Sequence, residues 1–143
     1  MKRAVVLFLL LPWLLGGVST VKFAPLYIGD RLFRVEVADT DSARARGLMF
    51  RRTLGEDQGL ILAWADDDLR TIWMKNCYIH LDLIFLNQRR QVVAIFANVP
   101  PCATEPCATY SVPIPVRYVL EICGGRAREL GLKVGDPLLF SID

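Results

Sequence analysis

Short segments in which apolar and polar side chains alternate dominate the chain from Leu26 onward. In the clearest of them, Phe33 and Val35 share one side while Arg34 and Glu36 share the other. A period of two is typical of a strand with one buried face. Turn residues interrupt such segments roughly every 8 to 12 positions, which is the pattern of a β-sandwich or β-barrel.

The sequence therefore predicts an all-β fold, a compact sandwich or partly open barrel of about eight strands with two short helices. Gly29-Asp30 separates the first two strands, and a glycine there tolerates the positive φ of a tight hairpin. The predicted strands are Leu26 to Ile28, Leu32 to Ala38, Leu60 to Trp64, Thr71 to Asn76, Leu81 to Leu86, Gln91 to Ala97, Val116 to Cys123 and Leu138 to Ile142.

Two segments have the features of short helices. Asp41 or Ser42 is suited to cap a helix over 43–49, because a side-chain oxygen at that position can accept from a free backbone N–H. A second helix is expected over 126–130, where Gly131 would end it in a left-handed conformation.

The first 20 residues resemble a secretory signal peptide. Lys2 and Arg3 provide a positive start, 4–15 is apolar, and small residues follow before the expected cleavage after Ser19 or Thr20. An uncleaved membrane anchor is the alternative, but the apolar run is shorter than the ~20 residues that span a bilayer. We therefore expect a signal peptide over 1–20 and a single β domain over 21–143, which acts in the periplasm or outside the cell.

The net charge of the chain changes when this segment is removed. The whole sequence has 17 Lys and Arg against 15 Asp and Glu, so loss of Lys2 and Arg3 leaves 15 of each. A formally neutral domain lacks the concentrated positive field of nucleic-acid binders and of polybasic membrane-surface proteins. We expect no nucleic-acid partner, and contact with a membrane only through the signal peptide before cleavage.

Four cysteines in an exported chain indicate disulfides before they indicate a metal. We favour a bond between Cys102 and Cys107, which would pin the proline-rich stretch 98–115, and consequently one between Cys77 and Cys123. In the alternative for the second pair, the two residues are buried small hydrophobes with free thiols.

A soft-metal site is a sharper hypothesis for part of this set. Met74, Cys77 and His80 lie close in the sequence, and copper(I) favours thiolate and thioether ligands. In an extended strand, however, Cys77 would face away from the other two, so only a bulge or turn could gather them. The sequence therefore predicts no metal and no cofactor.

Two carboxylates interrupt apolar runs, Asp82 in 81–86 and Glu121 in 116–123. A buried carboxylate needs a partner or an opening to solvent, and Lys75, Arg46 and Arg117 are plausible cations. The pair could perform acid and base chemistry or hold a ligand. The alternative is a structural ion pair, or an acid that accepts from backbone amides at a bend.

Several motifs together resemble one known family, the domain of unknown function 192. They are Arg46-Gly-Leu-Met49, Gly59-Leu-Ile-Leu62, Trp73-Met-Lys-Asn76, Leu81-Asp-Leu-Ile-Phe85, Tyr110, Leu120-Glu121 and Gly131-Leu-x-x-Gly-Asp136. The resemblance implies a compact, mostly β domain, often exported, with no agreed biochemical activity. Cys77, His80 and Cys123 depart from the usual pattern of that family, which supports pairing of the two cysteines.

Two classes of function follow from these residues. The first is a non-catalytic module that binds a small molecule or a protein segment in a cleft with aromatic walls and a few charges. The second is a hydrolase or transferase that uses Asp82 and Glu121, which requires both carboxylates in one pocket. The candidate ligand-binding residues are Arg46, Trp73, Lys75, Asn76, Asp82, Tyr110 and Glu121.

Overall fold

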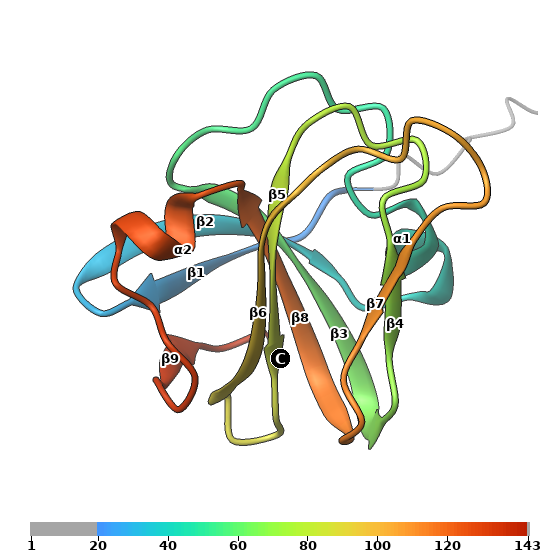
Figure 1. Ribbon diagram of the computed structural model, residues 1–143. Coiled ribbons are helices and arrows are strands. Elements are labelled where there is room, and N and C mark those ends of the chain that lie inside the picture. The colour runs from blue at the N-terminus through green and yellow to red at the C-terminus, as the bar shows by residue number, and fades with distance from the viewer. Residues whose placement is uncertain (1–19, 143) are drawn as a thin grey trace, which may run out of the picture.

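The computed structural model describes residues 20–142, so the predicted signal peptide lies almost wholly outside the described residues. The described chain is mostly β, with nine strands and two short helices, which confirms the predicted fold class (Figure 1). The elements in order are β1 (Phe23–Ile28), β2 (Arg31–Ala38), α1 (Asp41–Arg46), β3 (Gln58–Asp68), β4 (Thr71–Trp73), β5 (Leu81–Leu86), β6 (Val92–Val99), β7 (Thr109–Ser111), β8 (Val116–Cys123), α2 (Arg126–Glu129) and β9 (Leu138–Phe140). In this part of the chain no helix has the length and apolar character needed to cross a membrane.

Seven strands form one curled sheet in the order β6-β5-β8-β3-β2-β1-β9, in which only β2 and β3 run parallel. The curl brings the two edges of the sheet together at one end. There Val92 donates to the Asp136 carbonyl at 2.9 Å, and Gly135 donates to the Val92 carbonyl at 2.8 Å. The sheet is thus a partly closed barrel, and β4 and β7 form a separate two-stranded sheet beside it (Figure 1).

The central strands are buried on both faces, which divides the apolar residues into two clusters. In β5, Ile84 and Leu86 face the barrel interior, whereas Leu83 and Phe85 pack in an outer cluster. The outer cluster fills the space between the large sheet and the small one, and Ile72 of β4 belongs to it. Burial on both faces explains why β5 is apolar at five of its six positions instead of alternating between apolar and polar residues.

The first hairpin has the predicted turn. Ile28 pairs with Arg31 across the two-residue loop Gly29-Asp30, and Gly29 has a φ of 60°. The predicted cap of the first helix was wrong, because Thr40 is the residue that caps α1: its hydroxyl accepts from the Ala43 N–H at 3.2 Å.

The ends of both helices also differ from the sequence prediction in detail. Gly47 ends α1, so the helix covers 41–46 rather than 43–49. The second helix, α2, agrees with the prediction within one residue, and Gly131 after it has the expected positive φ.

The long proline-containing segment is pinned as predicted. Cys102 and Cys107 form a disulfide, with a Cα to Cα distance of 5.4 Å. The segment also contains β7, which the sequence analysis did not predict and which pairs with β4 through Ile72 and Tyr110.

The predicted bridge between Cys77 and Cys123 was wrong, because both thiols are free. Cys77 is buried in the outer cluster, whereas Cys123 lies at the end of β8, where its Sγ donates to the Leu54 carbonyl at 3.0 Å. The alternative of two small free thiols, one buried and the other half-buried, therefore holds.

Candidate functional site

A cleft of about 220 Å³ opens between the end of α1 and β4. Its walls come from α1 and the turn after it, from β3, from β4 with the residues that follow it, and from β8. Its lining residues are Arg44, Ala45, Arg46, Gly47, Leu48, Met49, Leu62, Trp64, Thr71, Ile72, Trp73, Lys75, Cys77 and Glu121. Four of the seven predicted ligand-binding residues thus meet in one place, namely Arg46, Trp73, Lys75 and Glu121.

Glu121 is the buried acid of this cleft. It lies opposite Leu60 on one side and Leu83 on the other, and both neighbours belong to the outer cluster. The residue is only 6% exposed, and its carboxyl makes no hydrogen bond or ion pair with the residues that the structure describes. Burial raises the pKa of Glu121 to about 7. The side chain therefore exchanges its proton near neutral pH.

The turn after α1 passes close to this carboxyl. Gly47 has a φ of 47°, and a Cβ at that position would lie 3.8 Å from Glu121 Oε2. A distance of this size is an ordinary contact, so glycine is favoured by the backbone conformation rather than by lack of space. The turn brings Arg46, the last residue of α1, to the cleft. The Arg46 guanidinium is exposed and has no hydrogen bond or ion pair within 20–142.

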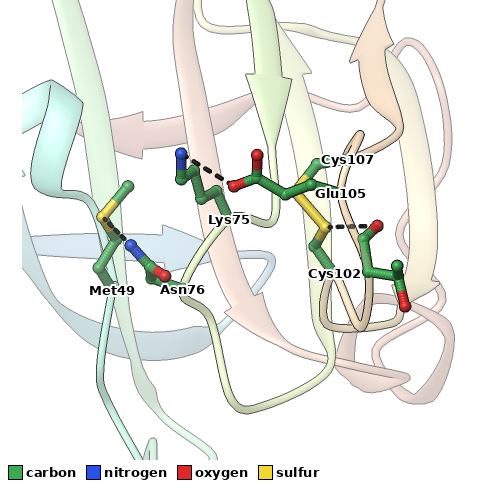
Figure 2. Close-up of a disulfide and its surroundings, with 7 residues drawn as sticks. Met49, Lys75, Asn76, Cys102, Glu105 and Cys107 are labelled. Carbon is green, nitrogen blue, oxygen red and sulfur yellow. Dashed lines mark hydrogen bonds and ion pairs between the residues drawn. A yellow bond between two sulfur atoms is a disulfide. The ribbon is translucent and has the colours of Figure 1, made fainter.

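An aromatic ring and a second cation form another part of the lining. Trp73 is 48% exposed, and Lys75 Nζ lies 5.1 Å from the centre of its ring. The same Nζ forms an ion pair with Glu105 at 2.9 Å. Figure 2 shows Lys75 extending towards Glu105, which stands on the loop that the disulfide closes. The charge of Lys75 is therefore partly neutralised, which leaves Arg46 as the cation without a partner among the described residues of the cleft.

The remaining walls are largely apolar. Leu48, Leu62 and Ile72 are buried, and the Cys77 thiol faces the same space. Burial, and then the charge of Glu121, raises the pKa of Cys77 to about 11. At neutral pH this residue is a thiol rather than a thiolate, which makes it a poor nucleophile.

The structure does not favour the soft-metal hypothesis. Met74 and Cys77 are buried together in the outer cluster, whereas His80 is exposed and lies against Gly124 at the far end of the segment. Within the described residues, no three His, Cys, Asp or Glu side chains are grouped closely enough to hold a metal ion.

Asp82, the other predicted acid, lies elsewhere. It pairs with Ile122 while Glu121 pairs with Leu83, so the two carboxylates point to opposite faces of the sheet. Asp82 is fully buried and accepts from the backbone N–H groups of Asn98, Gly125 and Ala127 at 2.7 to 2.8 Å. The hypothesis of a paired acid and base is therefore wrong, and the alternative of an acid bound to backbone amides describes Asp82 correctly.

Three other predicted residues also lie outside the cleft. Tyr110 packs edge-on against Phe96 and lines a separate hollow beside the disulfide. Asn76 has a φ of 56°, and its carbonyl accepts from the Phe50 N–H at 2.7 Å. Asn76 thereby fixes the chain next to the cleft without lining it. Arg117 pairs with Asp67 at 2.8 Å and reaches neither buried acid.

Several lining residues were not predicted from the sequence. Gly47, Leu48 and Met49 follow Arg46 in the chain, and they could have been found through the motif that contains all four residues. Arg44 and Trp64 have no such signal, because their places depend on how α1 packs over β3. The Arg44 guanidinium lies 5.4 Å from the Trp64 ring centre and donates to the Ala63 carbonyl at 2.6 Å.

Comparisons with known proteins agree with this fold. A crystal structure described as a putative transcription regulator from Sinorhizobium meliloti has a TM-score of 0.78 and 30% identity, covering 87% of this chain and 98% of that one. A crystal structure of a protein of unknown function from Novosphingobium aromaticivorans has a TM-score of 0.77 and 38% identity, covering 86% and 89% respectively. No curated protein matches the chain at a significant level. The model of the DUF192 family, described as an uncharacterized ACR, matches residues 25–140. The chain belongs to the DUF192 family.

Proposed function

We propose that this protein is an exported, non-catalytic binding module whose cleft takes a small molecule or a side chain of a protein segment. The observation that carries the proposal is the position of Glu121, a buried carboxyl without a described partner that faces an open cleft. Burying a carboxyl is unfavourable unless it is hydrogen-bonded, so a group that donates to Glu121 would bind there with advantage. If Glu121 belonged to a structural ion pair, its carboxyl would already have a partner.

The size of the cleft limits what it can hold. Its volume of about 220 Å³ is smaller than the ~300–1,000 Å³ of sites for drug-sized ligands. A molecule of a few carbon atoms, or one protruding side chain, is the appropriate scale. The exposed face of Trp73 can extend the contact beyond the cleft itself.

Catalysis is the weaker alternative. The predicted acid and base are separated by the sheet, and the Cys77 thiol is held in its protonated form at neutral pH. Glu121 alone could transfer a proton near pH 7, but the described lining offers it no activated nucleophile.

Export is part of the proposal, and the disulfide between Cys102 and Cys107 is compatible with it because such bonds persist in oxidising compartments. Mass spectrometry of the protein recovered after expression of the full chain tests this point. We expect a mass that lacks about the first 20 residues. An intact N-terminus on a protein retained inside the cell would contradict export.

We propose no nucleic-acid partner, although the protein from Sinorhizobium meliloti is described as a putative transcription regulator. Without the first 20 residues this chain has 15 basic and 15 acidic residues, which gives no net attraction to phosphates. A filter-binding assay at low salt would detect DNA affinity and refute this part of the proposal.

The binding function is tested by NMR with a library of small polar fragments. We expect some fragments to shift the indole signal of Trp73 and the carboxyl signal of Glu121 together. Trp73→Ala should lower the affinity for those fragments several-fold. The control Leu139→Ala, which removes an apolar side chain exposed on β9, should leave their binding unchanged. If no fragment shifts the two signals, the cleft is not a binding site.

A further inference from the structure

The charges of the cleft are distributed unevenly. The buried end presents a single carboxyl, that of Glu121, whereas the guanidinium of Arg46 is exposed to solvent. Neither group has an ion pair or a hydrogen bond to the chain between residues 20 and 142. Arg44 and Lys75 also line the cleft, but they are occupied by Asp41 and Glu105.

Most of the remaining lining of the cleft is apolar. Leu48, Leu62 and Ile72 contribute buried side chains to the lining, and the protonated Cys77 adds a weakly polar wall. A ligand that satisfies both Glu121 and Arg46 therefore needs a donor at its inner end, an anion at its outer end and an apolar body between them. A ligand with the two charged groups but no apolar part would leave the apolar lining of the cleft exposed to water.

We propose that the cleft binds a small zwitterion, in which a short aliphatic chain separates a primary ammonium that pairs with Glu121 from a carboxylate that pairs with Arg46. The inference rests on the proposed binding function and specifies its ligand class. The ammonium supplies the hydrogen bonds that the buried carboxyl lacks. Arginine suits the other end because its planar fork of donors matches a carboxylate.

The ion pair requires Glu121 to be ionised. The groups around it are Arg44 and Arg46 from α1, Lys75 and Cys77 from the segment after β4, and apolar neighbours on β3 and β5. Cys77, with a pKa of about 11, stays protonated between pH 6 and 8, so Glu121 dominates the pH response. With its pKa at about 7, the apparent affinity should be about tenfold weaker at pH 6 than at pH 8.

Calorimetric titration of the protein produced from the full chain tests the ligand class. The probes are glycine, β-alanine, γ-aminobutyrate and ε-aminocaproate, which differ only in chain length, together with butyrate and butylamine as half-ligands. We expect the zwitterion of one particular chain length to bind at least tenfold more tightly than either half-ligand. In the Glu121→Gln protein, the affinity for that zwitterion should fall to the affinity for butyrate. In the Arg46→Gln protein, it should fall to the affinity for butylamine.

Glu56→Gln, which neutralises an exposed carboxylate outside the cleft, is the matched control and should leave every affinity unchanged. If butylamine or butyrate binds as tightly as every zwitterion, the ligand class is wrong. It is equally wrong if other fragments shift the Trp73 and Glu121 signals while no zwitterion binds, and in both cases the binding function itself survives. If fragments and zwitterions all fail to bind, both proposals fall.

Discussion

Glu121 should reduce the stability of the free protein above pH 4.5. Its pKa in the folded protein, about 7, is higher than the ordinary value of 4.5, so the folded state holds the proton more tightly than the unfolded state does. The free energy of unfolding should therefore fall between pH 4.5 and 7 and then level off. The difference between the two pKa values corresponds to a loss of about 3 kcal/mol in the free energy of unfolding. Glu121→Gln should remove this loss and be more stable than the wild type at pH 8.

Urea unfolding of both proteins from pH 4 to pH 8 measures the difference. Glu56→Gln changes an exposed carboxylate in the same way and should keep the pH dependence of the wild type. A Glu121→Gln protein with the same pH dependence as the wild type would show that Glu121 has a partner when ionised.

Asp82 should instead stabilise the fold, because its carboxyl oxygens are acceptors for buried backbone amides. Its two oxygens accept three backbone N–H groups, which connect β5 to the end of β6 and to the start of α2. Asp82→Ala leaves these donors without an acceptor and should lower the free energy of unfolding by about 3 kcal/mol or more. Asp136→Asn, in a surface turn, should cost less than about 1 kcal/mol. If Asp82→Ala unfolds in urea like the wild type, the three bonds are not important for stability.

The contrast between these two acids shows what the sequence could predict about the site. Each appeared as one carboxylate within an apolar run, and that pattern correctly identified both as buried. It could not distinguish them, because their faces depend on the pairing register of β5 and β8. A shift of one residue in that register reverses which side chains face the barrel interior.

At the scale of elements, the loop that carries the disulfide should determine the position of the Lys75 side chain. Glu105 lies between the two bridged cysteines and pairs with Lys75. Replacing both Cys102 and Cys107 by serine should loosen this loop and speed hydrogen exchange of the backbone amide at position 102, which donates to the Met74 carbonyl at 3.3 Å. The closed loop is short, so we expect a loss of global stability of about 2 kcal/mol or less.

Glu105→Gln separates the effect of the ion pair from the effect of the disulfide, because it removes the ion pair and keeps the disulfide. Hydrogen exchange of the Cys102 amide should then remain as slow as in the wild type. Equally slow exchange in the double serine variant would mean that packing, and not the disulfide, holds the loop in place.

The elements also differ in how far local sequence determines them. The predicted bounds of β5 and β8 are those of the structure, because both strands are mainly apolar and tertiary contacts cover them on two faces. The predicted fourth strand continues to Asn76, but β4 ends at Trp73, where the chain turns and the Met74 carbonyl accepts from Cys77 and from Cys102. β7 escaped prediction because only three residues pair, between prolines, and their partner is remote in the sequence.

At the scale of the whole molecule, closure of the barrel depends on a short last strand. Of its three residues, Leu138 and Phe140 are buried in the barrel interior, whereas Leu139 is 66% exposed. Phe140 packs edge-on against Tyr118 at 5.2 Å between ring centres, and Arg90 lies above its ring. Phe140 therefore contacts β8, from the middle of the sheet, and the turn before β6, and these contacts add to the backbone hydrogen bonds that close the barrel.

Phe140→Ala should consequently destabilise the whole barrel and not only its last strand. Removing a buried phenylalanine typically costs about 3–5 kcal/mol. The neighbouring Leu139→Ala removes an exposed side chain from the same strand and should change stability by less than about 0.5 kcal/mol. Thermal unfolding, followed by Trp fluorescence and by far-UV circular dichroism, measures both variants. One coincident transition at a lower temperature for Phe140→Ala is the expected result. Separate transitions for the two probes would show instead that the end of the barrel opens independently of the cleft.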